Sequence, residues 1–220
     1  MTGRSDWCFP EGAVAFLADL RANNNRDWFT QNKARYEQAV KQPAQTFCDE
    51  ICPRLEALTG RPHSAKIFRI YRDVRFSKDK TPYNTHLHIS FSPTQTTGAE
   101  PAWFFALEPD KLIFGAGCFG FDKPVLERYR QNVAGNGGAE LLGLLEHLGA
   151  LGMRVSEPDL KRVPKSYDPE GPHAPLLLRK GLSAWSDNAD TAGATAPGLI
   201  ALCLAEYGQL KPLFDWLAEL

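Results

Sequence analysis

The sequence has no strong excess of charge, no long apolar run and no regular cysteine pattern, and each absence excludes a class of protein. Lys and Arg total 25 against 26 Asp and Glu, so the formal net charge is −1. No global field therefore attracts nucleic acid or an anionic membrane. No apolar stretch reaches the roughly 20 residues of a membrane-spanning helix, and the opening MTGRSDWCFPEG lacks the apolar segment of a secretory signal. We expect a cytoplasmic protein with no membrane partner, in which any cationic site is local.

The five cysteines are scattered and include no CxxC pair, which argues against a disulfide framework and a zinc ribbon. Cys48 and Cys52 stand four residues apart on an expected helix, a spacing that two metal ligands can use. They accompany apolar residues at helical spacing, so we interpret them as small buried side chains and expect no metal site.

Motifs of common nucleotide and hydrolase chemistry are also missing. The sequence contains no GxxxxGK[ST] loop, no GxGxxG after a strand, no GxSxG elbow and no HExxH helix. The segment GAGCFG lacks the spacing of a dinucleotide fingerprint and falls late in an expected strand. The cofactor, if there is one, is therefore unknown from sequence.

The chain has 220 residues, of which 43% are hydrophobic, and this is enough to form the core of one folded domain. Helical spacing of apolar residues runs from about Pro10 to Gly60. It resumes after Asp122, an expected N-cap, and returns in a closing region where Pro212 is expected to start a second helix. The polar, small-residue stretch 186–197 is predicted to be a flexible surface loop.

Between these helical regions the apolar residues alternate, which is typical of strands. We predict strands over 66–76, 86–91 and 103–108, with the last entering a tight turn at Pro109-Asp110 and returning over 112–118. The prediction is an α+β fold in which a central, mostly antiparallel sheet is flanked by amino-terminal and carboxy-terminal helices. It forms a single domain over residues 1–220, with its core from about 10 to 220.

The apolar faces of these elements define the expected core. Its members are Trp28, Phe29, Phe68, Ile70, Val74, Phe105 and Leu107.

The segment FRIYRDVRFSKDKTPYNTH, residues 68–86, carries an unusual density of charge for a strand. Arg69, Asp73 and Arg75 share one face of an extended chain, with Asp73 about 7 Å and Arg69 roughly 20 Å from Arg75. The two guanidinium groups can hold one anion only if the strand bends. The alternative is a solvated face whose ion pairs contribute ~0–1 kcal/mol each and have no function. We favour an anion site, because arginines, a proline and aromatic residues occur together.

This interpretation assigns roles to particular side chains. The expected ligands of the anion are Arg69, Arg72, Arg75, Lys78, Lys80 and Tyr83, joined by Arg130 and Lys165 from the second half of the chain. The candidate catalytic residues are His86, Glu108 and Asp73.

His86 and His88 form an HxH pair on one face of a predicted strand, an arrangement that can present two imidazoles to a metal. No third ligand stands near them in sequence, so we favour a histidine bonded to a neighbour, or one acting as a general acid or base.

Two functions remain open at this point. One is an enzyme acting on a phosphorylated or carboxylated small molecule; the other is a non-catalytic module for an acidic partner or nucleic acid phosphates. An anionic small molecule is the expected partner in preference to nucleic acid, and the sequence indicates no oligomeric state. A concave site with enclosed titratable groups favours the enzyme, and an open face favours the module.

Four stretches together resemble the domain of unknown function family 2461, a set of bacterial and fungal proteins. They read LRANNNRDWFTQNKARYEQAV, FRIYRDVRFSKDKTPYNTHL, FFALEPDKLIFGAGCF and LKRVPKSYD. The resemblance runs from about Ala13 to the closing helix. It implies an α+β single domain and implies no activity.

Overall fold

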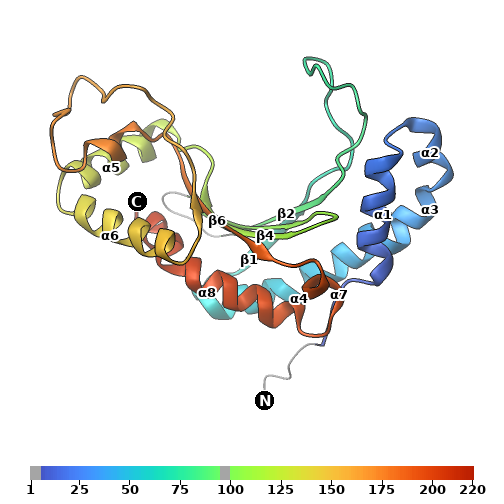
Figure 1. Cartoon of the computed structure of the whole chain (residues 1–220). Helices are drawn as coiled ribbons and strands as arrows, with labels where there is room; N and C mark the ends of the chain where they lie inside the picture. The colour runs from blue at the N-terminus through green and yellow to red at the C-terminus, as the bar shows by residue number, and fades with distance from the viewer. Residues whose placement is uncertain (1–5, 95–99) are drawn as a thin grey trace.

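The computed structural model describes residues 6–94 and 100–220, and its central sheet has an arm rising on each side (Figure 1). One arm contains the first helices and a long hairpin that leaves the sheet, and the other contains helices from the second half of the chain. The amino-terminal elements are α1 (Glu11–Ala22), α2 (Arg26–Gln31), α3 (Lys33–Tyr36), the π-helical turn η1 (Glu37–Lys41) and α4 (Gln42–Thr59).

Local signals set the ends of these helices. Asn25 caps α2, because its side chain accepts a 2.9 Å hydrogen bond from the Trp28 N–H. Gly60 ends α4 in the left-handed conformation, with φ at +73°, which glycine adopts without a Cβ clash. The predicted helical start of the chain is confirmed.

The sheet has six strands in the order β1-β2-β3-β4-β6-β5, and each neighbouring pair is antiparallel. The strands are β1 (His63–Ile67), β2 (Leu87–Pro93), β3 (Ala102–Leu107), β4 (Leu112–Cys118), β5 (Arg154–Val155) and β6 (Leu182–Ala189). The turn after Leu107 pairs β3 with β4, as predicted. The α+β class is confirmed.

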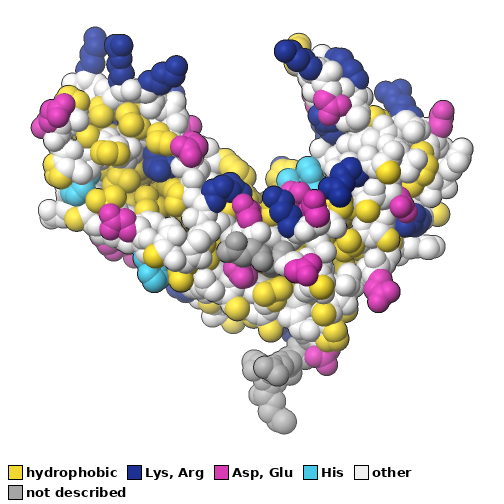
Figure 2. Space-filling model, in the orientation of Figure 1, with side chains coloured by type: hydrophobic (Ala, Val, Ile, Leu, Met, Phe, Trp, Pro, Cys, Tyr) yellow, Lys and Arg dark blue, Asp and Glu magenta, His cyan; other side chains and the backbone are white. Residues whose placement is uncertain are grey.

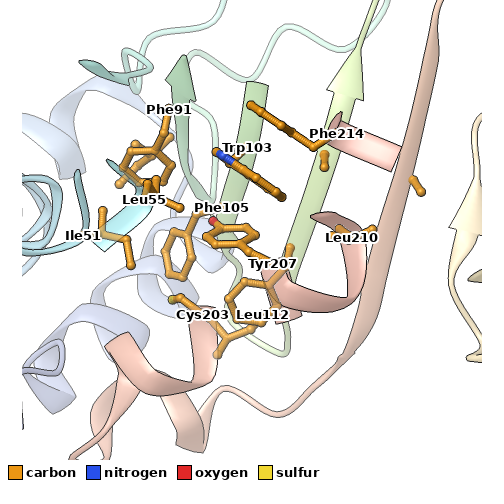
Figure 3. Close-up of a cluster of buried hydrophobic side chains, with 14 of the residues drawn as sticks. Ile51, Leu55, Phe91, Trp103, Phe105, Leu112, Cys203, Tyr207, Leu210 and Phe214 are labelled. Atoms are coloured by element: carbon orange, nitrogen blue, oxygen red, sulfur yellow. The ribbon is translucent and has the colours of Figure 1, made fainter. Parts of the chain in front are cut away.

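Helix α4 and the closing helix α8 (Leu199–Ala218) cover one face of this sheet (Figure 1). The core lies between these helices and the sheet, and in it Trp103 of β3 stacks on Phe214 of α8 with ring centroids 4.2 Å apart (Figure 3). The buried Tyr207 hydroxyl donates to the Phe104 carbonyl at 3.1 Å, which satisfies a polar group inside the core. Contrary to prediction, α8 runs through Pro212 without a break.

The other face of the sheet is open between the two arms (Figure 1). The second arm contains α5 (Lys123–Ala134), α6 (Gly137–Ala150) and the short 3₁₀ helix η2 (Ala174–Leu178). Asp122 caps α5 through a 2.8 Å bond from the Val125 N–H, which confirms the predicted cap. Within the described residues, no helix is long and apolar enough to cross a membrane.

The predicted strand over Phe68–Phe76 is wrong. Strand β1 ends at Ile67, and the chain then leaves the sheet as an irregular hairpin that returns to β2. A second correction concerns 186–197, where β6 continues to Ala189 and a short helix α7 (Ala192–Thr195) follows in place of a loop. Pairing with β4 holds this polar stretch in the sheet.

Most of the expected core is correct. Phe29, Ile70, Phe105 and Leu107 are buried, and Trp28 is half-buried against the core. Phe68 is 43% exposed, because it continues the open-face alternation of Lys66 at the end of β1. Val74 is only half-buried, since it belongs to the hairpin that extends away from the sheet.

Candidate functional site

The residues from Phe68 to His86 form a hairpin arm that rises from the sheet (Figure 1). Its two sides pair at the base, where the Phe68 N–H donates to the His88 carbonyl at 2.9 Å and the Arg72 N–H donates to the Pro82 carbonyl at 2.9 Å. The predicted return of the chain as a hairpin is therefore present, in irregular form. It brings residues from both sides of the arm together above the sheet.

Side chains within the arm fix its shape. Arg72 donates to the Asp79 carboxylate at 2.6 Å and also to the Thr81 hydroxyl. Lys80 donates to the Val74 carbonyl at 2.9 Å across the arm. Two of the predicted anion ligands, Arg72 and Lys80, are thus engaged in holding the hairpin together.

Arg75 is engaged as well. Its guanidinium forms paired bonds to the Asp73 carboxylate, of 2.9 Å from Nε to Oδ1 and 2.6 Å from Nη2 to Oδ2. This bonding lowers the pKa of Asp73, which therefore stays an ionised carboxylate rather than a proton donor. The Arg75 side chain is 76% exposed.

A cleft of about 400 Å³ lies at the base of the hairpin arm, and we call it the arm cleft. Histidine and basic side chains gather there, on the hollowed side of the molecule (Figure 2). The lining residues are Phe68, Arg69, Tyr71, Arg72, Asp73, Asn84, His86 and His88. The structure thus brings together Arg69, Arg72, Asp73 and His86 from the predicted set.

Arg69 differs from the neighbouring arginines in its partners. Within residues 6–94 and 100–220, its guanidinium makes no ion pair and no side-chain hydrogen bond. Asn84 fixes the backbone beneath it, donating from its side chain to the Arg69 carbonyl at 3.3 Å and from its backbone to the Ile70 carbonyl at 2.7 Å. Arg69 therefore lines the cleft without an ion pair among the described residues, although its charge, after the bonds from Arg75, helps to lower the pKa of Asp73.

The two histidines stack on each other, with ring centroids 3.7 Å apart and planes 18° from parallel. Burial, together with the neighbouring His86, lowers the pKa of His88 to about 4. Burial also lowers the pKa of His86, although the negative charge of Glu108 opposes this shift. Both imidazoles are neutral at pH 7, so each offers one N–H donor and one acceptor nitrogen.

Glu108 stands beside this pair, at the end of β3. Its backbone N–H donates to the Lys111 carbonyl at 3.0 Å across the β3–β4 turn, which fixes its position. It lines a neighbouring hollow together with His88 rather than the arm cleft itself. A carboxylate near a neutral histidine is an arrangement that supports proton transfer.

Tyr83 does not reach the cleft. It is buried and stacks on Phe29 with ring centroids 4.1 Å apart. The Asn24 side chain makes two bonds to its backbone, accepting from the Tyr83 N–H at 3.1 Å and donating to the Tyr83 carbonyl at 2.9 Å. Asn24 and Asn84 thus hold the base of the hairpin arm, and sequence reasoning gave neither of them a role. The NNNRDWF stretch is the sequence signal that points to Asn24.

The remaining predicted ligands lie apart from Arg69. Lys78 is exposed on the outer part of the hairpin arm. Arg130 belongs to α5 and Lys165 to the loop before η2, both on the opposite arm (Figure 1). One anion therefore cannot contact all of these cations, and the candidate anion site is limited to the residues of the arm cleft.

The next question is whether the described residues include metal ligands or a reactive thiol. In the part of the chain that the structure describes, no three His, Cys, Asp or Glu side chains are grouped to hold a metal ion. Burial raises the pKa of the Cys48 thiol to about 12, so it is not a thiolate at neutral pH.

Fold and site together define an α+β protein with an open sheet face and a histidine-lined basic cleft beside it. The chain belongs to the family described as conserved hypothetical protein DUF2461, whose model matches residues 12–216. No curated protein matches the chain.

Proposed function

We propose that this protein binds a small anion, a phosphate or carboxylate group, in the arm cleft. Arg69 supplies the charge, and the neutral imidazoles of His86 and His88 supply hydrogen bonds. The observation that carries the proposal is the contrast among the arginines of the arm. Arg72 and Arg75 are paired with carboxylates, whereas Arg69 lines the cleft with no ion pair among the described residues. Arg69 also borders two neighbouring hollows towards α3 and η1.

The size of the cleft favours a small molecule over an acidic protein surface. Its volume of about 400 Å³ falls within the ~300–1,000 Å³ typical of small-molecule sites. One free guanidinium also matches one oxyanion, because its parallel N–H groups bind two oxygens of a phosphate or carboxylate.

A catalytic role on a phosphorylated or carboxylated substrate is the second candidate function. The proximity of Glu108 to His86 favours it, since the carboxylate raises the pKa of the imidazole against the effect of burial. In this role His86 transfers a proton and Glu108 stabilises its charged form. Asp73 contributes indirectly, because its oxygens are occupied by Arg75.

Calorimetric titration with inorganic phosphate tests the binding site. Losing a charged hydrogen-bond donor costs ~1.5–3 kcal/mol, so Arg69→Ala should weaken binding by about 10- to 150-fold. Arg69→Lys should recover part of the loss through its charge. Arg162→Ala is the matched control, because Arg162 is an exposed arginine on the opposite arm with no ion pair in the described chain.

Equal affinities of the wild type, Arg69→Ala and Arg162→Ala would refute the assignment of the anion to the arm cleft. Circular dichroism of each variant establishes that the fold persists, since exposed Arg69 makes no packing contribution comparable to a core residue.

A further inference from the structure

A second hollow, of about 540 Å³, lies on the open face of the sheet beside the arm cleft. We call it the aromatic hollow. It shares Phe68 and His88 with the arm cleft, so the two spaces adjoin. Its aromatic side chains beyond Phe68 and His88 are Phe104, Phe119 and Trp185.

The floor of the aromatic hollow is shaped to hold Trp185 flat. A Cβ atom at Gly115 would lie 2.4 Å from Cε3 of Trp185, so only glycine on β4 lets the indole lie against that strand. The indole N–H donates to the Ser183 hydroxyl at 3.0 Å. The Arg154 guanidinium lies 5.8 Å from the ring centroid and is itself paired with Asp187. The ring is therefore fixed before any ligand arrives.

Other aromatic rings leave apolar surface open around it. Phe119 is 70% exposed although its ring lies 4.6 Å from Phe104 and 5.8 Å from Trp185. Phe68, on the boundary with the arm cleft, is 43% exposed. Exposed aromatic rings grouped in a concave space mark a binding surface rather than scattered surface residues.

We infer that the ligand carries a flat aromatic ring joined to its anionic group. This inference rests on the proposed function: Arg69 holds the anion in the arm cleft, and the ring stacks against Phe119 and Trp185 in the aromatic hollow. Phe68 and His88 line both spaces, so a molecule that binds in both must cross this boundary. A nucleoside monophosphate has this chemistry, and its one phosphate matches Arg69, the arginine on the arm cleft that has no ion pair among the described residues.

The test compares three probes in calorimetry: adenosine monophosphate, ribose 5-phosphate, which has the same phosphate without the ring, and adenosine, which has the ring without the phosphate. Stacking of a base on an aromatic side chain contributes ~1–3 kcal/mol, which corresponds to about 5- to 150-fold in affinity. In the wild type, adenosine monophosphate should bind more tightly than ribose 5-phosphate by a factor in this range. Adenosine should bind more weakly than its monophosphate.

Variants locate the ring. Phe119→Ala should weaken the binding of adenosine monophosphate by about 5- to 150-fold and change the affinity for ribose 5-phosphate by less than about twofold. Phe76→Ala is the matched control, because Phe76 is 96% exposed on the hairpin arm and should leave both affinities unchanged. Arg69→Ala should weaken the binding of both adenosine monophosphate and ribose 5-phosphate. Binding should also quench tryptophan fluorescence, and Trp185→Phe should remove most of that quenching.

The outcomes separate the two proposals. If adenosine monophosphate and ribose 5-phosphate bind with equal affinity and Arg69→Ala abolishes both, the inference of an aromatic ring on the ligand is wrong and the proposed anion site is retained. Tight binding of the monophosphate that is unaffected by Phe119→Ala and Trp185→Phe would overturn the aromatic hollow as its location. Binding of adenosine equal to that of its monophosphate, unaffected by Arg69→Ala, would overturn the anion site and with it this inference.

Discussion

Asn24→Ala should destabilise the protein by detaching the hairpin arm from the helices beside it. The Asn24 side chain makes two hydrogen bonds to the Tyr83 backbone, of 2.9 Å and 3.1 Å, and Tyr83 is 5% exposed. Each such bond contributes ~0.5–1.5 kcal/mol, and buried groups left without partners cost up to ~1–3 kcal/mol. A loss of about 1–3 kcal/mol in the free energy of unfolding follows.

Urea denaturation followed by circular dichroism measures this loss, and thermal melts provide a second reading. For a chain of this length, 1 kcal/mol shifts Tm by ~2–4 °C, so the expected fall is about 2–12 °C. Asn23→Ala is the matched control, because the Asn23 side chain is exposed and bonds locally, to the Asp19 carbonyl at 2.9 Å. If Asn23→Ala and Asn24→Ala unfold at the same midpoint, Asn24 does not anchor the arm.

Two further predictions concern the core and the histidines. Ile70→Ala should cost ~2–5 kcal/mol, because Ile70 is 5% exposed, whereas Phe76→Ala in the same arm should cost less than ~0.5 kcal/mol; similar urea midpoints for the two would contradict this. The pKa of His88 is about 4 in the folded state and about 6.5 when unfolded, so the unfolded state binds more protons between these values. Stability should therefore fall as pH drops from about 6.5 to about 4, with His88 accounting for at most ~3 kcal/mol, and a pH profile of His88→Gln parallel to the wild type would refute this.

The features predicted correctly from sequence depend on neighbouring residues in the chain. The predicted cap Asp122 accepts a bond from the backbone N–H three residues ahead. The Pro109-Asp110 turn joins two apolar runs that pair as β3 and β4. Such short-range signals leave few alternatives, because the partner of each group is fixed by the local chain.

The features predicted wrongly depend on contacts with residues that are distant in the chain. Alternation continues through Phe68–Phe76, but a strand needs a neighbour, and β1 has no regular pairing beyond Ile67. Helix α8 continues through Pro212 because the buried Leu210 and Leu213 on either side pack in the core, which outweighs the missing N–H.

The candidate site shows the same division. Sequence identified Arg69, Asp73 and His86 as neighbours in a site, and the structure places all three on the arm cleft. It did not show which arginine stays free, because Arg72 pairs seven residues ahead and Arg75 two residues back. The aromatic hollow draws on β3, β4 and β6, whose contacts only the folded sheet creates.

The most direct test of the anion site is a crystal soaked in sodium selenate, with diffraction data collected at the selenium absorption edge. Selenate is a tetrahedral oxyanion like phosphate, and its selenium atom marks its own position. The proposal predicts an anomalous peak in the arm cleft, with selenate oxygens at hydrogen-bonding distance, ~2.7–3.2 Å, from the Arg69 guanidinium and an imidazole N–H of His86 or His88. Selenate bound only at exposed cations such as Lys78, with the arm cleft empty, would contradict it.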